Sequence, residues 1–454
     1  MNKSVLIITP YFAPQSHAAV FRAYKLAKYL PHFGWKPYVL TVDTNYLYNE
    51  DLSLLAALPQ VVEIIRARYI EPTLRGLRMA LSGDNRTFIN LKKQSVFDEN
   101  EILETIVSDQ TPLHRLYNYL LDAWVQIPDA HWTWYRPAVR AAKKLIRQYN
   151  IPIVFTSANP FTCHKIGSAL QKEGCRWVAD LRDPHTYCHY MCSRHSRVFT
   201  LQRKAEHNAV TKADAVTVAS PAIGMILTDT YGLDSSFQPH FIPTGLDEEL
   251  LLSKNDQQSK PYPYILFSGE FLPEYGIEFL SIFSSAVKIS GVQGKNHKLI
   301  FVGRKEINMA RVTPILKKLG IEKNVEFFDH MPQQQLYGLL KAAKAAVLIS
   351  SRYFRWWCLY AKLVDYIALQ KPVLALVPDP SVARTELNRT RLGIFLDGDK
   401  NNCVKIMANF LQDNINLPPP NKDECNRYLA IYQVQAFVKL FESLNLKSSL
   451  KDIK

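Results

Sequence analysis

Long apolar runs are missing from this sequence. Among its 454 residues, no uninterrupted apolar stretch approaches the roughly 20 residues that a membrane-spanning helix needs. The amino-terminal segment also lacks the long apolar stretch and the small-residue cleavage site of a signal peptide. We therefore expect a cytoplasmic protein.

Cysteine is scarce, and its number is odd. The seven cysteines are scattered along the chain, so they do not form the pattern of a disulfide framework, and we expect reduced thiols in a reducing compartment. Hydrophobic residues make up 47% of the chain and charged residues 21%. This balance is typical of a globular protein and excludes a mainly disordered or collagen-like chain.

Acidic residues are fewer than basic ones. The chain has 41 Asp and Glu against 55 Lys and Arg, which gives a formal net charge of +14. Such a surface attracts anions, for example nucleotides, nucleic acids or acidic lipid headgroups. Because the sequence carries no aromatic RNA-binding platform and no zinc module, we expect no nucleic-acid partner.

The order of the apolar runs predicts an α/β fold. Residues 5–9 form a short β-branched run, typical of a strand buried in a parallel sheet, and a helical pattern at 19–30 leads to a second run at 38–42. The chain therefore opens as strand, helix, strand. Further runs of the same kind occupy residues 152–156, 177–180, 213–219, 238–243, 264–269, 299–303, 325–328, 346–349 and 372–376.

Chain length and the two series of runs predict two Rossmann-like parallel-sheet domains. We expect the first at residues 1–250 and the second at 264–420. The segment 251–263 is polar and ends in Pro-Tyr-Pro, so we predict a linker there. Residues 421–447 contain apolar side chains at helical spacing and are expected to form a carboxyl-terminal helix.

A basic insertion is predicted at about residues 45–127, which do not fit the strand and helix repeat. Bases such as Arg66, Arg68 and Arg75 outnumber the acids in it. One interpretation is an interfacial patch that docks on an anionic membrane or shapes an acceptor pocket. The other is a solvated basic loop beside a core helix.

Residues 358–362 are the best candidate for a phosphate-binding segment. In open α/β sheets, ligands bind outside the carboxyl ends of strands, where helix amino termini present unpaired N–H groups to anions. Tyr360 and Ala361 open a predicted helix, and Lys362 adds a full positive charge there. Asp365 lies one turn further and could accept hydrogen bonds from a ribose. The alternative is that Lys362 and Asp365 form an ordinary surface pair.

The same region carries a family resemblance. Residues 362–376, KLVDYIALQKPVLAL, resemble the Lys-Leu-x-Glu-Tyr-Leu-Ala-x-Gly-Lys-Pro-Ile-Leu-Ala segment of GT-B glycosyltransferases of family four. The resemblance runs from about residue 5 to residue 400 and covers the N-terminal-like domain and the C-terminal group 1-like domain of those enzymes. Blocks similar to the first half of the family follow in the family's order at residues 127–134, 157–164, 180–184, 213–217 and 242–247.

This resemblance implies a retaining glycosyltransferase of GT-B architecture. Two Rossmann-like domains would face a cleft, with a nucleoside diphosphate sugar held mainly by the second domain and a saccharide or lipid-linked acceptor by the first. UDP or GDP is the expected nucleotide, no metal is required, and the carboxyl-terminal helix crosses back to the first domain. We expect a role in polysaccharide or glycolipid biosynthesis, with peripheral contact at the cytoplasmic face of a membrane as a further prediction.

Fixed positive charge is the main chemical requirement of such a reaction. Negative charge develops on the departing diphosphate, so fixed positive groups beside it lower the barrier. Besides Lys362 we expect Arg304, which follows the run 299–303, to act there, with Lys305 as a lesser candidate. The alternative for both residues is a solvated turn.

Two departures from the family concern the expected donor site. Many relatives carry two glutamates eight positions apart where this chain has Trp357 and Asp365. With the first carboxylate lost, contacts to the sugar hydroxyls would come from Arg352, Arg355 or backbone N–H groups.

A third departure follows the strand that opens the second domain. Relatives commonly have Arg and Lys there, whereas Gly269 and Glu270 stand in this chain. Glu270 would repel a diphosphate, so we expect it to bind sugar hydroxyls. Relatives also often have a Gly-Gly turn after the first strand, where this chain has residues 16–19, SHAA.

Asp180, Arg182 and Asp183 are the candidate catalytic residues of the first domain. They lie at the end of the run 177–180, where a carboxylate could orient or deprotonate the acceptor hydroxyl and Arg182 could fix its geometry. The alternative is that Arg182 and one aspartate tie the loop together. His164 is expected to be packed or capping.

Other classes of function remain open at this stage. His and Cys residues between 185 and 195 fall on one helix face, but one face seldom surrounds a zinc ion with four ligands, so we expect no metal site. The lost family residues leave room for a catalytically impaired GT-B-like binding or scaffold protein. A nucleotide-sugar epimerase on the same fold is a further alternative.

Overall fold

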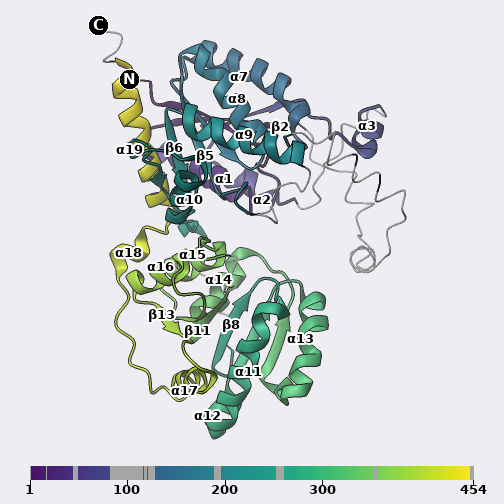
Figure 1. Cartoon of the computed structure of the whole chain (residues 1–454), viewed down its shortest axis with the longest axis vertical. Coiled ribbons are helices and arrows are strands. Elements are labelled where there is room, and N and C mark those ends of the chain that lie inside the picture. The colour runs from purple at the N-terminus through teal and green to yellow at the C-terminus, as the bar shows by residue number, and fades with distance from the viewer. Residues whose placement is uncertain are drawn as a thin grey trace. The chain divides into compact units, whose positions relative to one another are not determined.

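The chain folds into two compact units (Figure 1). Unit 1 comprises Met1–Ile242 and Val434–Lys454, and unit 2 comprises Pro243–Gln433. The computed structural model describes residues 2–16, 18–43, 50–81, 116, 120, 128–188, 196–251, 260–350 and 355–449.

Unit 1 is built on a parallel sheet of seven strands within the described residues, in the order β3-β2-β1-β4-β5-β6-β7. The strands are β1 (Ser4–Ile8), β2 (Lys36–Val42), β3 (Glu63–Ala67), β4 (Ile153–Ala158), β5 (Arg176–Leu181), β6 (Ala215–Val218) and β7 (His240–Phe241). The helices are α1 (Phe21–Tyr29), α2 (Ser53–Ala56), α3 (Leu74–Leu81), α7 (Tyr135–Tyr149), α8 (Thr162–Leu170), α9 (Ser196–Lys212) and α10 (Pro221–Tyr231).

Unit 2 is built on a second parallel sheet, of six strands in its described part, in the order β10-β9-β8-β11-β12-β13. The strands are β8 (Tyr264–Ser268), β9 (Lys298–Val302), β10 (Val325–Phe328), β11 (Ala345–Ile349), β12 (Val373–Leu376) and β13 (Gly393–Phe395). The helices are α11 (Pro273–Ile289), α12 (Gly291–Asn296), α13 (Lys305–Leu319), α14 (Gln333–Ala342), α15 (Ala361–Ala368), α16 (Val382–Thr390), α17 (Lys400–Leu411) and α18 (Lys422–Asn426).

Strand periodicity explains the layers of unit 2. Alternate residues of a strand point to opposite faces of its sheet. Ile265 and Phe267 accordingly belong to one buried cluster and Leu266 to another. Helices cover both faces, so the strands are apolar throughout, as is usual in parallel sheets.

The predicted α/β fold with two Rossmann-like sheets is confirmed. One part of the predicted insertion is nevertheless a sheet strand, because β3 pairs in parallel with β2. Arg66 lies on this strand, and its guanidinium donates hydrogen bonds to the carbonyl oxygens of Val42 and Ala13. The solvated-loop interpretation is therefore wrong for this arginine, whereas most of residues 82–127 lie outside the described part of the chain.

The carboxyl-terminal helix α19 (Ala430–Ser449) begins in unit 2 and continues into unit 1. In unit 1, Phe437 packs edge-on against Phe155 of β4, and Phe441 lies 5.5 Å from Trp35 between ring centroids. Aromatic packing of this kind adds to the stabilisation from burial. It fixes this part of α19 on the sheet of unit 1.

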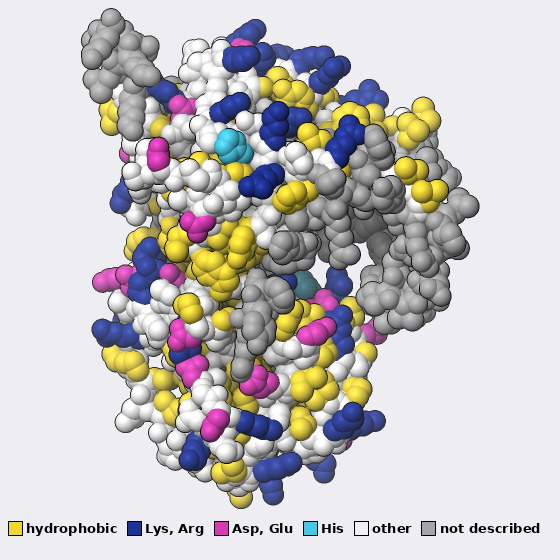
Figure 2. All heavy atoms as spheres, in the orientation of Figure 1, with side chains coloured by type: hydrophobic (Ala, Val, Ile, Leu, Met, Phe, Trp, Pro, Cys, Tyr) yellow, Lys and Arg dark blue, Asp and Glu magenta, His cyan; other side chains and the backbone are white. Residues whose placement is uncertain are grey.

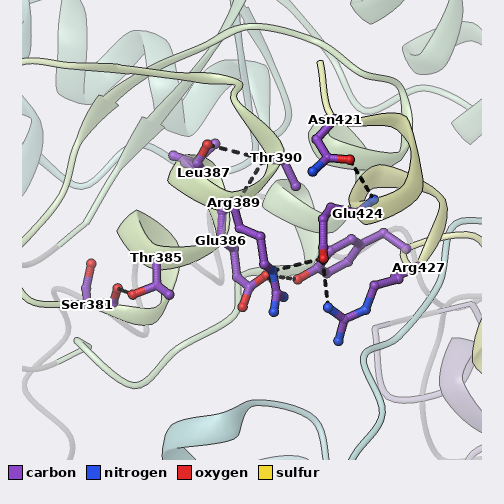
Figure 3. A network of polar contacts seen from close by, with 10 residues as sticks. Ser381, Thr385, Glu386, Leu387, Arg389, Thr390, Asn421, Glu424 and Arg427 are labelled. Carbon is purple, nitrogen blue, oxygen red and sulfur yellow. Dashed lines mark hydrogen bonds and ion pairs between the residues drawn. The ribbon is translucent and has the colours of Figure 1, made fainter. Parts of the chain in front are cut away.

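A polar network in unit 2 holds α18 on α16 (Figure 3). Glu386 is buried, pairs with Arg389 and accepts a hydrogen bond from Tyr428 Oη at 2.5 Å. Arg389 Nε also lies 3.0 Å from Glu424, and Arg427 lies 2.7 Å from the same carboxylate. The buried charge of Glu386 is thus compensated by both an ion pair and a hydrogen bond.

Candidate active site

The strand order of unit 2 marks one place for a ligand. Successive strands run outward in opposite directions from the pair β8 and β11, which makes the gap between their carboxyl ends a topological switch point. The loop that follows β8 begins with Gly269, and the segment that follows β11 leads to α15 and Lys362. The two loops predicted to hold the donor therefore flank the place where doubly wound sheets bind ligands.

Lys362 is a cation beside the switch point between β8 and β11. Its Nζ lies 4.1 Å from the centroid of the Phe267 ring. The side chain is half-buried, and no described residue accepts a hydrogen bond or forms an ion pair with its ammonium. Burial lowers the pKa of Lys362 to about 8, and the charge of Arg355 adds to this lowering. The site thus holds a desolvated ammonium next to a second cation.

The amino terminus of α15 adds its dipole to this charge. Tyr360 is the N-cap residue and makes no side-chain capping bond to the helix, while its hydroxyl is hydrogen-bonded to Ser350. Ala361 is exposed at the first helical position. Since the first N–H groups of a helix have no intrahelical partner, this end favours an anion.

Gly269 lets the backbone approach the lysine. It has φ of +106°, and a Cβ at this position would lie 3.4 Å from Lys362 Nζ. Asn308 fixes the loop, because its side-chain amide donates to the Gly269 carbonyl at 3.0 Å and its oxygen accepts from the Phe271 N–H at 2.8 Å. A Cβ on Gly303 would lie 2.6 Å from the Gly269 oxygen, so the loops after β8 and β9 touch through their backbones.

Two further predicted residues lie on these loops. Arg304 is exposed and is the N-cap residue of α13, and its guanidinium has no hydrogen-bond or ion-pair partner among the described residues. The carboxylate of Glu270 lies 2.6 Å from the Arg311 guanidinium. This pair reduces the repulsion that Glu270 would exert on a diphosphate.

Asp365 and Trp357 occupy the positions where relatives carry glutamates. Asp365 accepts a hydrogen bond of 3.2 Å from the Tyr337 hydroxyl, so the surface ion pair with Lys362 is not formed in the described structure. Trp357 is buried, and the neighbouring Trp356 carbonyl accepts from the Val382 N–H at 2.7 Å. Arg352 lies outside the described residues.

The structure corrects the catalytic role predicted for Asp180. This residue is fully buried within β5, and its carboxylate accepts hydrogen bonds from Arg22 Nε and Nη2 at 2.8 and 2.6 Å, Ser157 Oγ at 2.8 Å and Thr217 Oγ1 at 2.6 Å. Burial alone would raise the pKa of Asp180, but Arg22 and the hydroxyl donors outweigh it and lower the pKa overall. Asp180 is a structural ion-pair partner that no acceptor reaches.

Arg182 joins the loops at the switch point of unit 1, between β1 and β4. Its guanidinium donates to the carbonyl oxygens of Ala158 at the end of β4 (2.7 Å), of Asn159 just after β4 (2.8 Å) and of Ala19 after β1 (2.9 Å). Asp183 lies half-buried beside it, two residues beyond the end of β5. The loop-tying alternative therefore describes Arg182, which acts as a positioning residue, and Asp183 is a further carboxylate of the same loop.

An aromatic cluster that was not predicted from the sequence lies at the same edge of unit 1. The His131 ring stacks on Tyr69 with 5.0 Å between centroids and meets the edge of Tyr11 at 5.3 Å. Asp129 caps α8 by accepting from the N–H and the hydroxyl of Thr162, both at 2.8 Å, and lies 4.0 Å from His131. Tyr11, Tyr69 and His131 come from three separate segments of the chain, so no local spacing in the sequence predicts the cluster.

His164 is packed, as predicted. It is buried, its Nδ1 lies 2.8 Å from Thr156 Oγ1, and burial lowers its pKa to about 4. Within the described residues, no group of three His, Cys, Asp or Glu side chains could hold a metal ion. Of the residues weighed as zinc ligands, His189, Cys192 and His195 lie outside the described ranges.

Comparison with known proteins identifies the second unit. Residues 251–414 match the family described as glycosyl transferases group 1. No curated protein sequence matches the chain. This match confirms the predicted family resemblance and the predicted glycosyltransferase for the domain of unit 2. The chain as a whole has the GT-B fold.

Solved structures with the same fold cover almost the whole chain. Sucrose-phosphate synthase from Thermosynechococcus elongatus has a TM-score of 0.62 at 14% identity, with 98% of this chain and 100% of that chain covered. Anabaena HepE, solved with UDP and glucose, has a TM-score of 0.55 at 13% identity, with 97% and 99% covered. A protein from Listeria monocytogenes that is described as a candidate UDP-N-acetylglucosamine 2-epimerase has a TM-score of 0.53 at 12% identity, with 98% of each chain covered.

The described helices include none that is long and apolar enough to cross a membrane.

Proposed function

We propose that this chain is a retaining glycosyltransferase that moves a sugar from a nucleoside diphosphate sugar to a hydroxyl acceptor. The observation that carries the proposal is the ammonium of Lys362, which is half-buried at the β8 and β11 switch point and has no hydrogen-bond or ion-pair partner among the described residues. A desolvated cation without a counter-ion is costly in a folded protein. An anionic ligand that binds there repays this cost.

The donor diphosphate is proposed to bind across the loops after β8, β9 and β11. Lys362, Arg355 and the free amino terminus of α15 supply positive potential at one side, and Arg304 supplies it at the other. As the bond from the anomeric carbon to the diphosphate oxygen breaks, negative charge grows on the leaving diphosphate. Groups that are already oriented toward that charge lower the barrier most.

The remaining donor contacts are assigned by chemistry. Asp365 is proposed to accept a hydrogen bond from the ribose, alongside the one that it accepts from Tyr337. Glu270, partly neutralised by Arg311, is proposed to bind hydroxyl groups of the sugar. The hydroxyl of Tyr360 and the N–H of Ala361 are proposed to face the diphosphate.

Asp183 is proposed to orient the acceptor hydroxyl on unit 1. Arg182 fixes the loops around it through three carbonyl contacts. A carboxylate at hydrogen-bond distance from the attacking hydroxyl can take up its proton as the new glycosidic bond forms. The domain limits of the sequence analysis, the retention of configuration and a saccharide or lipid-linked acceptor belong to the same proposal.

UDP is the first candidate nucleotide, because HepE was solved with UDP and glucose. Calorimetric titration with UDP, GDP and ADP tests the donor site. We expect the Lys362→Met variant to bind the preferred nucleotide about 100-fold more weakly, since it loses charge-assisted contacts. Lys295→Met, which removes an exposed lysine of α12, is the matched control and should leave the affinity unchanged.

Product analysis then separates the enzyme classes. Incubation of the preferred nucleotide sugar with and without saccharide acceptors should give nucleoside diphosphate and a glycoside whose anomeric configuration is that of the donor. An epimerised sugar formed without acceptor would replace the proposal by the epimerase. A chain that binds none of the three nucleotides would favour a scaffold.

A further inference from the structure

Helix α7 carries a line of basic residues along its outer face. Arg136, Arg140, Lys144 and Arg147 are exposed, and their spacings of four, four and three residues place them on one side of the helix. We call these four residues the α7 stripe. The 11 residue-to-residue steps from Arg136 to Arg147 correspond to about 16 Å of helix. The opposite face of α7, which includes Ala138, Ala142, Leu145 and Ile146, is buried in unit 1.

Within the described residues, an acidic residue balances only Arg147 of this stripe. From residue 130 to residue 172 the sequence has seven Lys and Arg and no Asp or Glu. Glu173 pairs with Lys143 and Arg147, whereas Arg136, Arg140 and Lys144 have no ion-pair or hydrogen-bond partner in the described ranges. Figure 2 shows Lys and Arg side chains gathered over this end of unit 1, where α7, α8 and α9 lie in Figure 1.

An exposed indole lies just before the amino terminus of α7. Trp132 lies four residues before Arg136, in the short helical turn that leads into α7, and is 44% exposed. The segment around it is fixed, because the Thr133 hydroxyl donates to the Ile70 carbonyl at 2.5 Å. The chain that leaves Ile70 forms α3, which exposes Leu77 and Leu81. A large exposed aromatic side chain, Trp132, therefore adjoins the uncompensated cations in the sequence.

We propose that the α7 stripe and Trp132 dock unit 1 on the surface of an anionic lipid bilayer. Clustered Lys and Arg on one helix face are attracted by anionic headgroups, each contributing roughly 1 kcal/mol near the surface. Tryptophan favours the boundary between headgroups and acyl chains. A soluble polyanion would satisfy the cations but gives no apolar layer for Trp132, so the combination favours a bilayer. This docking surface is separate from the donor site of unit 2.

Vesicle co-sedimentation tests the docking surface with the full chain. We expect binding to phosphatidylcholine vesicles that contain phosphatidylglycerol, weak binding to pure phosphatidylcholine, and loss of binding as salt rises. The triple variant R136Q/R140Q/K144Q should bind the anionic vesicles about 100-fold more weakly, which corresponds to about 1 kcal/mol for each charge. Trp132→Ala should weaken binding at high and low salt alike.

The matched control removes the same charge from exposed positions of unit 2. K295Q/K317Q/K318Q should keep vesicle binding within about twofold of the unchanged chain, since those lysines lie outside the surface. Circular dichroism and the unfolding midpoint establish that both triple variants fold. Nucleotide titration of the stripe variant should equal that of the unchanged chain, so a failure of the proposed donor site is recognised separately.

Three outcomes would overturn the proposal. The first is equal binding to anionic and neutral vesicles. The second is an equal loss in the stripe and control variants, which would mean that net charge alone acts. The third is binding of a polyanion such as heparin or RNA through the stripe with no binding to vesicles.

Discussion

The ammonium of Lys362 lies over the ring of Phe267, 4.1 Å from its centroid, at the edge of the sheet where the loop of Gly269 turns away. A cation over an aromatic face gains some attraction but no hydrogen bond. The lysine is therefore held in place, and no hydrogen-bond acceptor in the described part of the chain occupies its ammonium. This relationship leads to two predictions about pH.

Binding of a nucleotide sugar should weaken above pH 8. Below that pH, Lys362 is protonated in the free protein and remains so when the diphosphate binds. Above it, the free protein has lost the proton and must take one up to form the charged contact, so affinity falls by up to about tenfold per pH unit. Calorimetry with UDP-glucose from pH 7 to 9 measures this, because its diphosphate does not titrate in that range. Lys362→Met should bind weakly with no such slope, and a parallel slope in that variant would contradict the assignment.

Lys362→Met should stabilise the folded protein at pH 7. The pKa of Lys362 is about 8 in the folded chain, against a model-peptide value of 10.5, so the folded state holds the charge less favourably than the unfolded state. This penalty is complete below pH 8 and disappears as pH rises from 8 toward 10.5. We expect a gain of about 1 kcal/mol in the free energy of unfolding at pH 7 that fades by pH 10. Denaturant titrations at both pH values check the difference, and a gain independent of pH would point to packing alone.

Gly269→Ala should impair nucleotide binding beyond its effect on stability. An alanine here would have to keep a φ of +106°, which residues with a side chain rarely adopt, and its Cβ would lie 3.4 Å from Lys362 Nζ. Gly398 provides a matched control, because it has φ of +81° and its added Cβ would lie 3.4 Å from the Asn402 amide nitrogen. Both variants should lose about 1 kcal/mol of stability. Only Gly269→Ala should bind UDP about tenfold or more weakly, and equal affinities in the two variants would remove Gly269 from the site.

The fold was largely predictable because buried parallel strands appear in the sequence as short runs of apolar, often β-branched residues. The exceptions have physical causes. Glu63 and Arg66 interrupt the apolar pattern of β3, which lies at the sheet edge and is only partly buried. An edge strand needs fewer apolar residues than a central one, so its sequence signal is weak.

The site was predictable only where one local segment carries it. Lys362 follows a strand and opens a helix, so local spacing was enough to propose it as a site residue. Asp180 could not be recognised as structural, because its partner Arg22 is 158 positions away in the sequence. The cluster of His131 and Tyr69 likewise depends on long-range packing of separate segments.

Substitutions of Asp180 and Asp183 should have different effects, the first on stability and the second on sugar transfer. Asp180→Asn leaves the buried guanidinium of Arg22 without its counter-charge and should cost about 3–5 kcal/mol of stability. Because the pKa of Asp180 is lowered in the folded chain, its stabilisation is present at neutral pH and is lost as pH falls through that lowered pKa. Acid denaturation of the unchanged chain should reflect this loss.

Asp183→Asn should slow sugar transfer and leave the stability of the fold nearly unchanged. This half-buried residue lies beyond the end of β5, so we expect a change below about 1 kcal/mol in stability but a fall of about 100-fold or more in the rate of sugar transfer. Nucleotide affinity, which depends on unit 2, should stay unchanged. Unfolding titrations, UDP calorimetry and single-turnover transfer assays on the two variants measure the contrast. Full transfer activity in folded Asp183→Asn would remove this carboxylate from the reaction, and an unaltered unfolding free energy in Asp180→Asn would contradict the buried ion pair.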